Sequence, residues 1–440
     1  MNQLAKKNHS SLKLKLKPLF ATLITTTLLN VAIPLPVEAE IKDSPKAVVD
    51  EVWQIVHQEF VDREFNQVDW QAKREELLSR QYATKKQAYR EINKALKDLG
   101  DPYTRFLAPE QFEVLTNQTS GEVSGVGIRI AIDPRTQDLI IIDTIKKSPA
   151  QEKGLQRGDR IVRIDGKPTA LMNLEEASDA LKGELGTKVS LEISRRGQSA
   201  FLVSITRSQI EVPSVEFSLK QEGEMKVGYI KLDEFSSHAA EQMQEAIQEL
   251  NKQQASAFVL DLRGNPGGLL FASVDIARMW MSEGEIVDIV DRQGGHKKFS
   301  ANNSAITNLP LVVLVDNNSA SASEILAGAL KENRRGVIVG TNTFGKGTVQ
   351  SVHSLSDGSG LAVTISRYFP PSGININNKG IAPDVFQGLS KRELRLLRRN
   401  PDLIGTQADA QYSKAIAVLR SQQVLPNPSF KLNNLQTQKK

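Results

Sequence analysis

The sequence contains 440 residues, of which 40% are apolar and 24% are charged, a composition that suits two or three globular domains with cores of their own. The formal net charge is +5, but residues 1–39 contribute five lysines and one glutamate. The remaining chain is therefore close to neutral, and a nucleic-acid partner is not indicated. The absence of cysteine excludes disulfides, a thiolate nucleophile and cysteine-based metal sites.

Residues 1–39 have the pattern of a secretory signal. A lysine-rich start is followed by the apolar stretch 19–33, and Val37-Glu38-Ala39 places small residues where cleavage is expected. The apolar stretch is short for a membrane span, and prolines follow it directly. An uncleaved membrane anchor is the alternative. Under either interpretation the body of the protein is exported.

Residues 40–118 are predicted to form a helical domain. Apolar residues recur at helical spacing from Ser44 onward, and Gly100 ends the last helix. The segment Asp101-Pro-Tyr-Thr-Arg-Phe106 then makes a turn that carries two aromatic side chains. We expect these aromatics to pack against the protein rather than to bind a ligand.

Residues 119–208 consist of short β segments punctuated by glycine, with one clear helix at 174–181. A glycine before an apolar strand can present bare N–H groups to a carboxylate. The order of the segments, and a glycine-containing loop, resemble a PDZ domain of the permuted bacterial kind, which implies capture of C-terminal peptide tails by strand addition. A small β-domain without a ligand is the alternative. The loop expected to bind the tail consists of Gly125, Val126, Gly127 and Ile128. The loop does not match a dinucleotide fingerprint, because Ile130 stands where the third glycine belongs.

Residues 209–389 alternate strand with helix, which predicts an α/β core with a mainly parallel sheet and a site at the carboxyl ends of its strands. Two polar loops, 263–268 and 317–324, follow buried strands and should converge at one edge of that sheet. Residues 390–440 are predicted to form a basic helical extension with a solvated face, followed by a polar tail.

A serine-rich turn between a buried strand and a helix is the candidate site of chemistry. The strand 311–315 runs into Asn317-Asn-Ser-Ala-Ser-Ala-Ser-Glu324. A serine there can attack a carbonyl while an adjacent N–H group holds the oxyanion. Helix capping is the alternative role of such residues. Ser319, Ser321 and Ser323 are the candidate nucleophiles in this turn, and Glu324 follows them directly.

An activated serine needs a base, and Lys346 is the better candidate. None of the five histidines stands on a glycine-rich loop beside a carboxylate. Lys346 lies in Phe344-Gly-Lys-Gly347, and a lysine can act as a base if burial lowers its pKa. The same loop begins like a phosphate-binding loop, but Gly347 replaces the magnesium-binding serine or threonine and a strand follows instead of a helix.

These segments together resemble the C-terminal processing (tail-specific) peptidase family over residues 45 to 390. The matching motifs are 101–106, 261–268, 319–324, 344–350, 367–373 and 380–384. The resemblance implies that Ser321 is the nucleophile, Lys346 the general base and Gln350 the residue that orients the lysine. We then expect Ser319 to cap the helix and Ser323 to lie inside it, with Glu324 securing the turn. The resemblance also implies that Gly267 and Ala322 donate the oxyanion-hole N–H groups. The chain departs from the family at Lys182, where relatives often carry arginine; if that cation senses the bound tail, lysine is only a partial substitute because it lacks the guanidinium fork.

We therefore expect a multi-domain α/β chain with an N-terminal helical domain, a permuted PDZ domain and a crotonase-like catalytic core. Its expected function is that of an exported serine endopeptidase that cleaves proteins with apolar C-terminal tails and needs neither a metal nor an organic cofactor. Relatives trim a photosystem II reaction-centre precursor, which points to the periplasm or thylakoid lumen. A non-catalytic tail-binding adaptor and a crotonase-like acyl-CoA enzyme are the alternatives. Oligomeric state and peripheral membrane association stay open.

Overall fold

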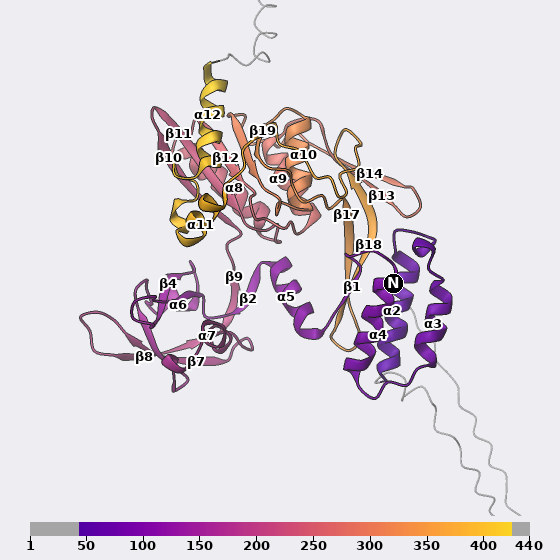
Figure 1. Ribbon diagram of the computed structural model, residues 1–440. Helices are drawn as coiled ribbons and strands as arrows, with labels where there is room; N and C mark the ends of the chain where they lie inside the picture. The colour runs from indigo at the N-terminus through magenta and orange to yellow at the C-terminus, as the bar shows by residue number, and fades with distance from the viewer. Residues whose placement is uncertain (1–43, 425–440) are drawn as a thin grey trace, which may run out of the picture. The chain divides into compact units, whose positions relative to one another are not determined.

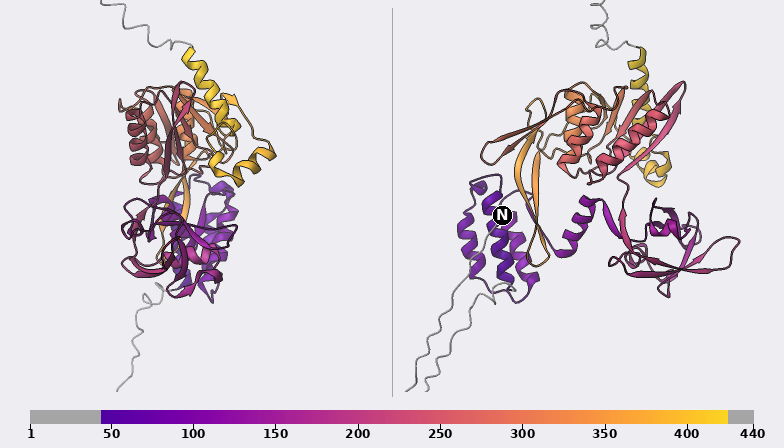
Figure 2. Two further views of the ribbon diagram at one scale, coloured as in Figure 1. Left: turned by 90° about the vertical axis from the view of Figure 1, so that its left-hand side faces the viewer. Right: turned by 180° about the vertical axis from the view of Figure 1, so that it is seen from behind.

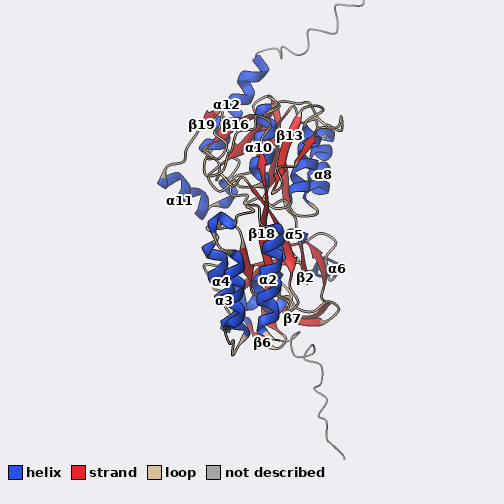
Figure 3. Ribbon diagram, turned by 90° about the vertical axis from the view of Figure 1, so that its right-hand side faces the viewer, coloured by secondary structure: helices blue, strands red, loops and turns tan. Residues whose placement is uncertain are grey.

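The computed structural model describes residues 44–424, so the predicted signal segment and the polar tail lie outside the described residues. Three helices come first, α2 (Pro45–Glu59), α3 (Trp70–Ser79) and α4 (Lys85–Asp98), and they stand side by side (Figure 3). Their apolar faces share a core with β18 (Gly360–Phe369), to which they contribute Trp53 and Trp70. The predicted helical region therefore packs on a strand that lies about 260 residues away in the chain.

The turn after α4 leads from these helices into the sheet that contains β18. The strand β1 (Arg105–Leu107) pairs antiparallel with β18, and β17 (Thr348–Ser354) pairs with the same strand. The sheet continues through β13 (Glu285–Asp291) to β14 (His296–Ser300). Helix α5 (Pro109–Ser120) then leads into the β-rich region. Because β1 belongs to the sheet that contains β17, the turn at 101–106 lies close to the strand that follows the lysine loop.

The β-rich region has the expected small sheet and single long helix. The strand order is β3-β4-β5-β7-β8, so that β3 lies at an edge, and helix α7 (Leu174–Leu181) has the predicted bounds. The strands are β3 (Ile128–Ile132), β4 (Leu139–Thr144), β5 (Arg160–Ile164), β7 (Lys188–Ser194) and β8 (Phe201–Thr206). A separate pair, β2 (Glu122–Gly125) with β9 (Ser208–Glu211), forms the entrance and exit of this region. The short elements are α6 (Pro149–Glu152) and β6 (Lys167–Pro168).

The core is a six-stranded sheet covered on both faces (Figures 1 and 2). Alternate residues of each strand belong to different apolar clusters; for example, Phe258 and Leu260 face α8, α9 and α10, whereas Val259 faces α12. The strands, in sheet order, are β10 (Val215–Glu222), β11 (Met225–Leu232), β12 (Ala257–Asp261), β15 (Leu311–Val315), β16 (Val337–Gly340) and β19 (Val385–Phe386). The helices are α8 (Ala239–Lys252), α9 (Leu270–Trp280), α10 (Ala322–Glu332) and α12 (Ala410–Val424). All pairs except β10 with β11 are parallel, as the strand–helix alternation predicts.

Buried ion pairs attach helix α12 to the core. The guanidinium of Arg263, in the loop after β12, contacts the carboxylate of Asp261 at 2.6 Å and that of Asp409 at 2.7 Å. Asp409 immediately precedes α12 and also accepts a hydrogen bond from the Gln411 amide. The three charged side chains are almost fully buried. Breaking such a network leaves a buried charge unpaired, so it holds the loop and the helix together.

Candidate active site

Ser321 stands where β15 ends and α10 begins, in a backbone conformation with φ 55° and ψ −114° that residues other than glycine rarely adopt. The neighbouring loop presses against it, because a Cβ added to Gly267 would lie 2.8 Å from the Ser321 Cβ and 2.8 Å from the Ala320 carbonyl oxygen. Only glycine leaves room for the two loops at this distance. The two polar loops predicted from the sequence therefore meet at Ser321.

The two competing serines have structural roles. The Ser319 hydroxyl donates to the Leu262 carbonyl at 2.8 Å, and the Ser323 hydroxyl donates to the Asn265 carbonyl at 3.0 Å, both in buried positions. The Ser321 hydroxyl donates no hydrogen bond within residues 44–424. The expectation that Ser319 caps the helix is wrong, because Ser321 occupies the N-cap position and Ser319 instead ties two loops together.

Glu324 links the serine turn to the lysine loop. One oxygen of its buried carboxylate accepts from the Thr343 hydroxyl at 2.6 Å and the Gly345 amide at 2.7 Å. The other accepts from the amides of Ser321 and Lys346, each at 2.9 Å. Burial raises the pKa of Glu324, and these donors partly offset that rise because they stabilise the ionised form. As expected from the sequence, the residue secures the turn, and it secures the lysine loop as well.

Replacing Glu324 with glutamine is expected to lower the free energy of unfolding by about 2–4 kcal/mol. The amide NH2 group would face two of the four donors, leaving buried N–H groups unpaired. Urea unfolding of the two proteins measures the difference. The matched control is Glu332→Gln on the same helix, whose carboxylate bonds Ser372 in an exposed position and should cost much less. Equal midpoints for Glu324→Gln and wild type would contradict this assignment.

Lys346 is half-buried, and its Nζ lies 4.9 Å from the centre of the Tyr103 ring. The pKa of Lys346 is lowered to about 8, mainly by burial and further by the positive charge of Arg105, while the charges of Asp101 and Glu324 act in the opposite direction. An amine with this pKa is partly neutral near pH 8 and can then accept a proton.

Sequence reasoning missed the contribution of the Asp101–Phe106 turn. Both aromatics were expected to pack; Phe106 is indeed buried, but Tyr103 contacts the lysine. The Asp101 carboxylate holds the turn by accepting from the amides of Tyr103 and Thr104, each at 3.1 Å. The only sequence signal was the match of this turn to a family motif, because periodicity does not reveal a contact across more than 240 residues.

Gln350 lies near the lysine loop but bonds elsewhere. Its Nε2 donates to the hydroxyls of Thr348 at 3.0 Å and Thr364 at 3.2 Å. Within residues 44–424, no hydrogen bond joins Lys346 Nζ to Gln350 or to Ser321 Oγ. The orienting role of Gln350 therefore stays a prediction.

The two N–H groups predicted to bind the oxyanion differ in whether they already have a hydrogen-bond partner. The amide of Ala322, the first residue of α10, has no hydrogen-bond partner in the described part of the chain. The amide of Gly267 donates to the Asn265 side chain at 2.8 Å. Ala322 is thus free to bind an oxyanion, whereas Gly267 would first have to release Asn265.

The predicted tail-binding loop is built to expose amides. The carbonyls of Val126 and Gly127 accept from the amides of Ala150 and Ile145, each at 2.9 Å, and so point inward. Neither the Val126 nor the Gly127 amide has a partner within residues 44–424. Gly127 has φ 81°, and a Cβ there would lie 2.2 Å from the Ser148 side chain. The flanking residues extend the strands, with Gly125 in β2 and Ile128 in β3.

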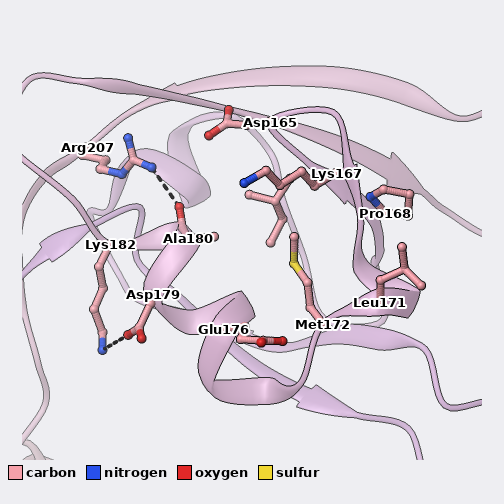
Figure 4. A pocket seen from close by; sticks show the side chains of 11 residues that line it. Asp165, Lys167, Pro168, Leu171, Met172, Glu176, Asp179, Ala180, Lys182 and Arg207 are labelled. Carbon is pink, nitrogen blue, oxygen red and sulfur yellow. Dashed lines mark hydrogen bonds and ion pairs between the residues drawn. The ribbon is translucent and has the colours of Figure 1, made fainter.

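A hollow of about 650 Å³ lies beside α7, and none of the four loop residues lines it (Figure 4). Lys182, the position where the chain departs from the family, lines this hollow and pairs with Asp179 at 3.3 Å. Arg207 donates to the Ala180 carbonyl at 2.8 Å and so holds the end of α7. This hollow is distinct from the predicted tail-binding loop.

Three of the described histidines have partners outside this site. Three histidines pair with carboxylates and not with Ser321, namely His238 with Glu122, His296 with Asp288 and His353 with Glu59. Across residues 44–424, no group of three metal-ligating side chains is close enough to hold an ion. In the same range, no helix has the length and apolar character needed to cross a bilayer.

A strained serine and a lysine of lowered pKa, both bonded to one buried glutamate and preceded in the chain by a small β-domain, fit the class of serine peptidases that carry a PDZ domain. A model of peptidase family S41 matches residues 226–386, and a PDZ domain model matches residues 140–195. The sequence is 44% identical over 334 residues to a carboxyl-terminal-processing protease of Synechocystis sp., covering 76% of this chain and 78% of that protein. It is 38% identical to a chloroplastic C-terminal processing peptidase of Tetradesmus obliquus, covering 80% and 79%.

A solved structure of a processing protease also matches this chain. The photosystem II D1 C-terminal processing protease matches with a TM-score of 0.52 and 36% identity, covering 84% of this chain and 99% of that one. The chain therefore belongs to the carboxyl-terminal-processing proteases of peptidase family S41. The predicted fold class, family and enzyme class, a serine peptidase, are confirmed. The roles of the individual site residues stay predictions.

Proposed function

We propose that this peptidase cleaves exported proteins close to their C-termini, with Ser321 as the nucleophile and Lys346 as the general base. The observation that carries the proposal is the shared Glu324 carboxylate. It binds the amides of both residues, and so couples a strained serine with a free hydroxyl to a lysine whose pKa is about 8. Nucleophile and base must be held in a fixed relation for acyl transfer, and one buried carboxylate bonded to both loops does so.

In the proposed reaction the Ser321 Oγ attacks the scissile carbonyl while Lys346 Nζ takes its proton. The Ala322 amide binds the oxyanion, joined by Gly267 once its bond to Asn265 is released. Lys346 then gives the proton to the leaving amine, and water hydrolyses the ester. The first step requires Lys346 Nζ to move from its position over Tyr103 to within hydrogen-bond distance of Ser321.

The tail of the substrate would bind at the loop 125–128. The free amides of Val126 and Gly127 suit a terminal carboxylate, and β3 is an edge strand, to which a peptide can add as a further strand. The substrates would thus be proteins with apolar C-terminal tails. By analogy with the D1-processing relative, we infer a photosystem II precursor as substrate and the thylakoid lumen or periplasm as compartment.

The function is tested with two forms of one unstructured substrate that ends in an apolar tail. One form has a free C-terminal carboxylate and the other a C-terminal amide, and mass spectrometry identifies the products. Cleavage near the tail is expected for both, at a rate at least about tenfold higher for the carboxylate because the amide removes its charge-assisted hydrogen bonds. Equal rates would contradict carboxylate capture by the loop. Binding without any cleavage would favour the adaptor.

A further inference from the structure

Helix α11 (Lys391–Arg399) presents a concentration of positive charge that its surroundings do not neutralise. All five of its basic side chains are exposed, and none forms an ion pair within residues 44–424. These residues are Lys391, Arg392, Arg395, Arg398 and Arg399. The single acidic residue of the helix, Glu393, caps its start by accepting from the Ser390 amide at 2.7 Å. The cations are therefore available to an external partner.

The cations share one face of the helix. With 3.6 residues per turn, the five basic residues fall within an arc of about 120°. Leu394 borders one edge of this arc and Leu396 the other, and these leucines are 41% and 43% exposed. Leu397, on the opposite face, is buried, and the helix packs against the short turn Pro401–Leu403. The exposed face is thus a basic stripe bordered by leucines.

We propose that α11 docks the protein on an anionic lipid surface. Arginine and lysine side chains are long enough to reach headgroup phosphates while their methylene stems and the flanking leucines enter the acyl boundary. A cluster of this size on an amphipathic helix is typical of binding to anionic lipids. The proposal does not depend on the catalytic assignments.

The leucines favour lipid over other acidic partners. A nucleic acid backbone would satisfy the five cations but would offer no apolar layer on both sides of the arc. An acidic protein would need apolar patches that match the positions of both leucines. A headgroup layer places negative charge and hydrocarbon side by side, so both kinds of side chain find a partner.

The test uses the chain from Glu40, which retains every described residue but lacks the predicted signal. Flotation with vesicles of phosphatidylcholine alone, or mixed with phosphatidylglycerol, measures binding. We expect binding only to the anionic vesicles, weakening with salt. Arg395→Glu with Arg398→Glu should weaken it at least about tenfold. The matched control, Lys94→Glu with Lys97→Glu on the exposed face of α4, makes the same change in charge and should bind like wild type.

A second double variant, Leu394→Ser with Leu396→Ser, separates lipid from other anions. It should weaken binding to vesicles and leave binding to soluble poly-glutamate unchanged. Cleavage of a soluble substrate should be unchanged in both α11 variants, which shows that they are folded. Three outcomes would overturn the proposal: no binding to anionic vesicles, equal losses in the α4 control, or α11-dependent binding to poly-glutamate alone.

Discussion

Replacing Ser321 with alanine is expected to lower kcat/KM by about 10⁴-fold or more, since the covalent route disappears with the hydroxyl. Ser319→Ala and Ser323→Ala are the matched controls, because each removes a neighbouring hydroxyl from the same turn. Both should keep cleavage within about tenfold per folded molecule, while losing about 1–3 kcal/mol of stability through their buried hydrogen bonds. Mass spectrometry and urea unfolding give the two readouts.

The contrast between the three serines makes the experiment decisive. The hydroxyls of Ser319 and Ser323 already donate to carbonyls in buried positions, whereas that of Ser321 donates to none within the described residues. If Ser321→Ala still cleaves at the wild-type rate and one of the other two does not, the nucleophile has been assigned to the wrong residue.

Replacing Lys346 with alanine is expected to lower kcat/KM by about 10³-fold or more, because the amine is lost and the Glu324 carboxylate is already bonded to four donors. Lys346→Arg should be equally inactive, since a guanidinium does not lose its proton near neutral pH. In wild type the base must be deprotonated, and its pKa is about 8. The value of kcat/KM should therefore rise about tenfold per pH unit below pH 8 and level off above it. A profile that is flat from pH 6 to 9 would exclude Lys346 as the base.

Replacing Arg105 gives a second test of the pH dependence of kcat/KM. Its positive charge lowers the pKa of Lys346, so Arg105→Gln should raise that pKa and shift the profile toward higher pH. The control is Arg135→Gln, which removes an equally exposed arginine from the β-rich region and should leave the profile in place. A shift toward lower pH in Arg105→Gln would show that the charge of Arg105 acts in another way.

Several elements with a buried apolar face were predicted from the sequence with the correct bounds, whereas two exposed elements were not predicted. The helix at 174–181 and the buried strand at 311–315 have the expected bounds, because burial imposes a period on their residues. Helix α5 has no buried residue, and β14 is almost entirely exposed. Neither leaves a hydrophobic pattern, so both were missed.

The site was predictable as a set of positions and not as a set of contacts. Motifs placed Ser321 and Lys346 on loops at the ends of strands. The four donors of Glu324, the ring beneath Lys346 and the threonines around Gln350 depend on side-chain conformations and on chain segments far apart in the sequence. A single sequence carries no period or spacing that encodes such contacts.

The buried ion pairs of Arg263 determine how late in synthesis the loop after β12 gains all of its contacts. Chains fold from the N-terminus as they emerge, and Asp409 follows every predicted catalytic residue. Until that residue has emerged, Arg263 has only one of its two buried carboxylate partners, and the loop that carries Gly267 lacks its attachment to α12. A nascent chain therefore already contains Ser321 and Lys346 before this loop has all of its contacts. Because Asp409 supplies this contact late in synthesis, we expect a chain that stops before it to hold the loop beside the serine less firmly than the longer chain does.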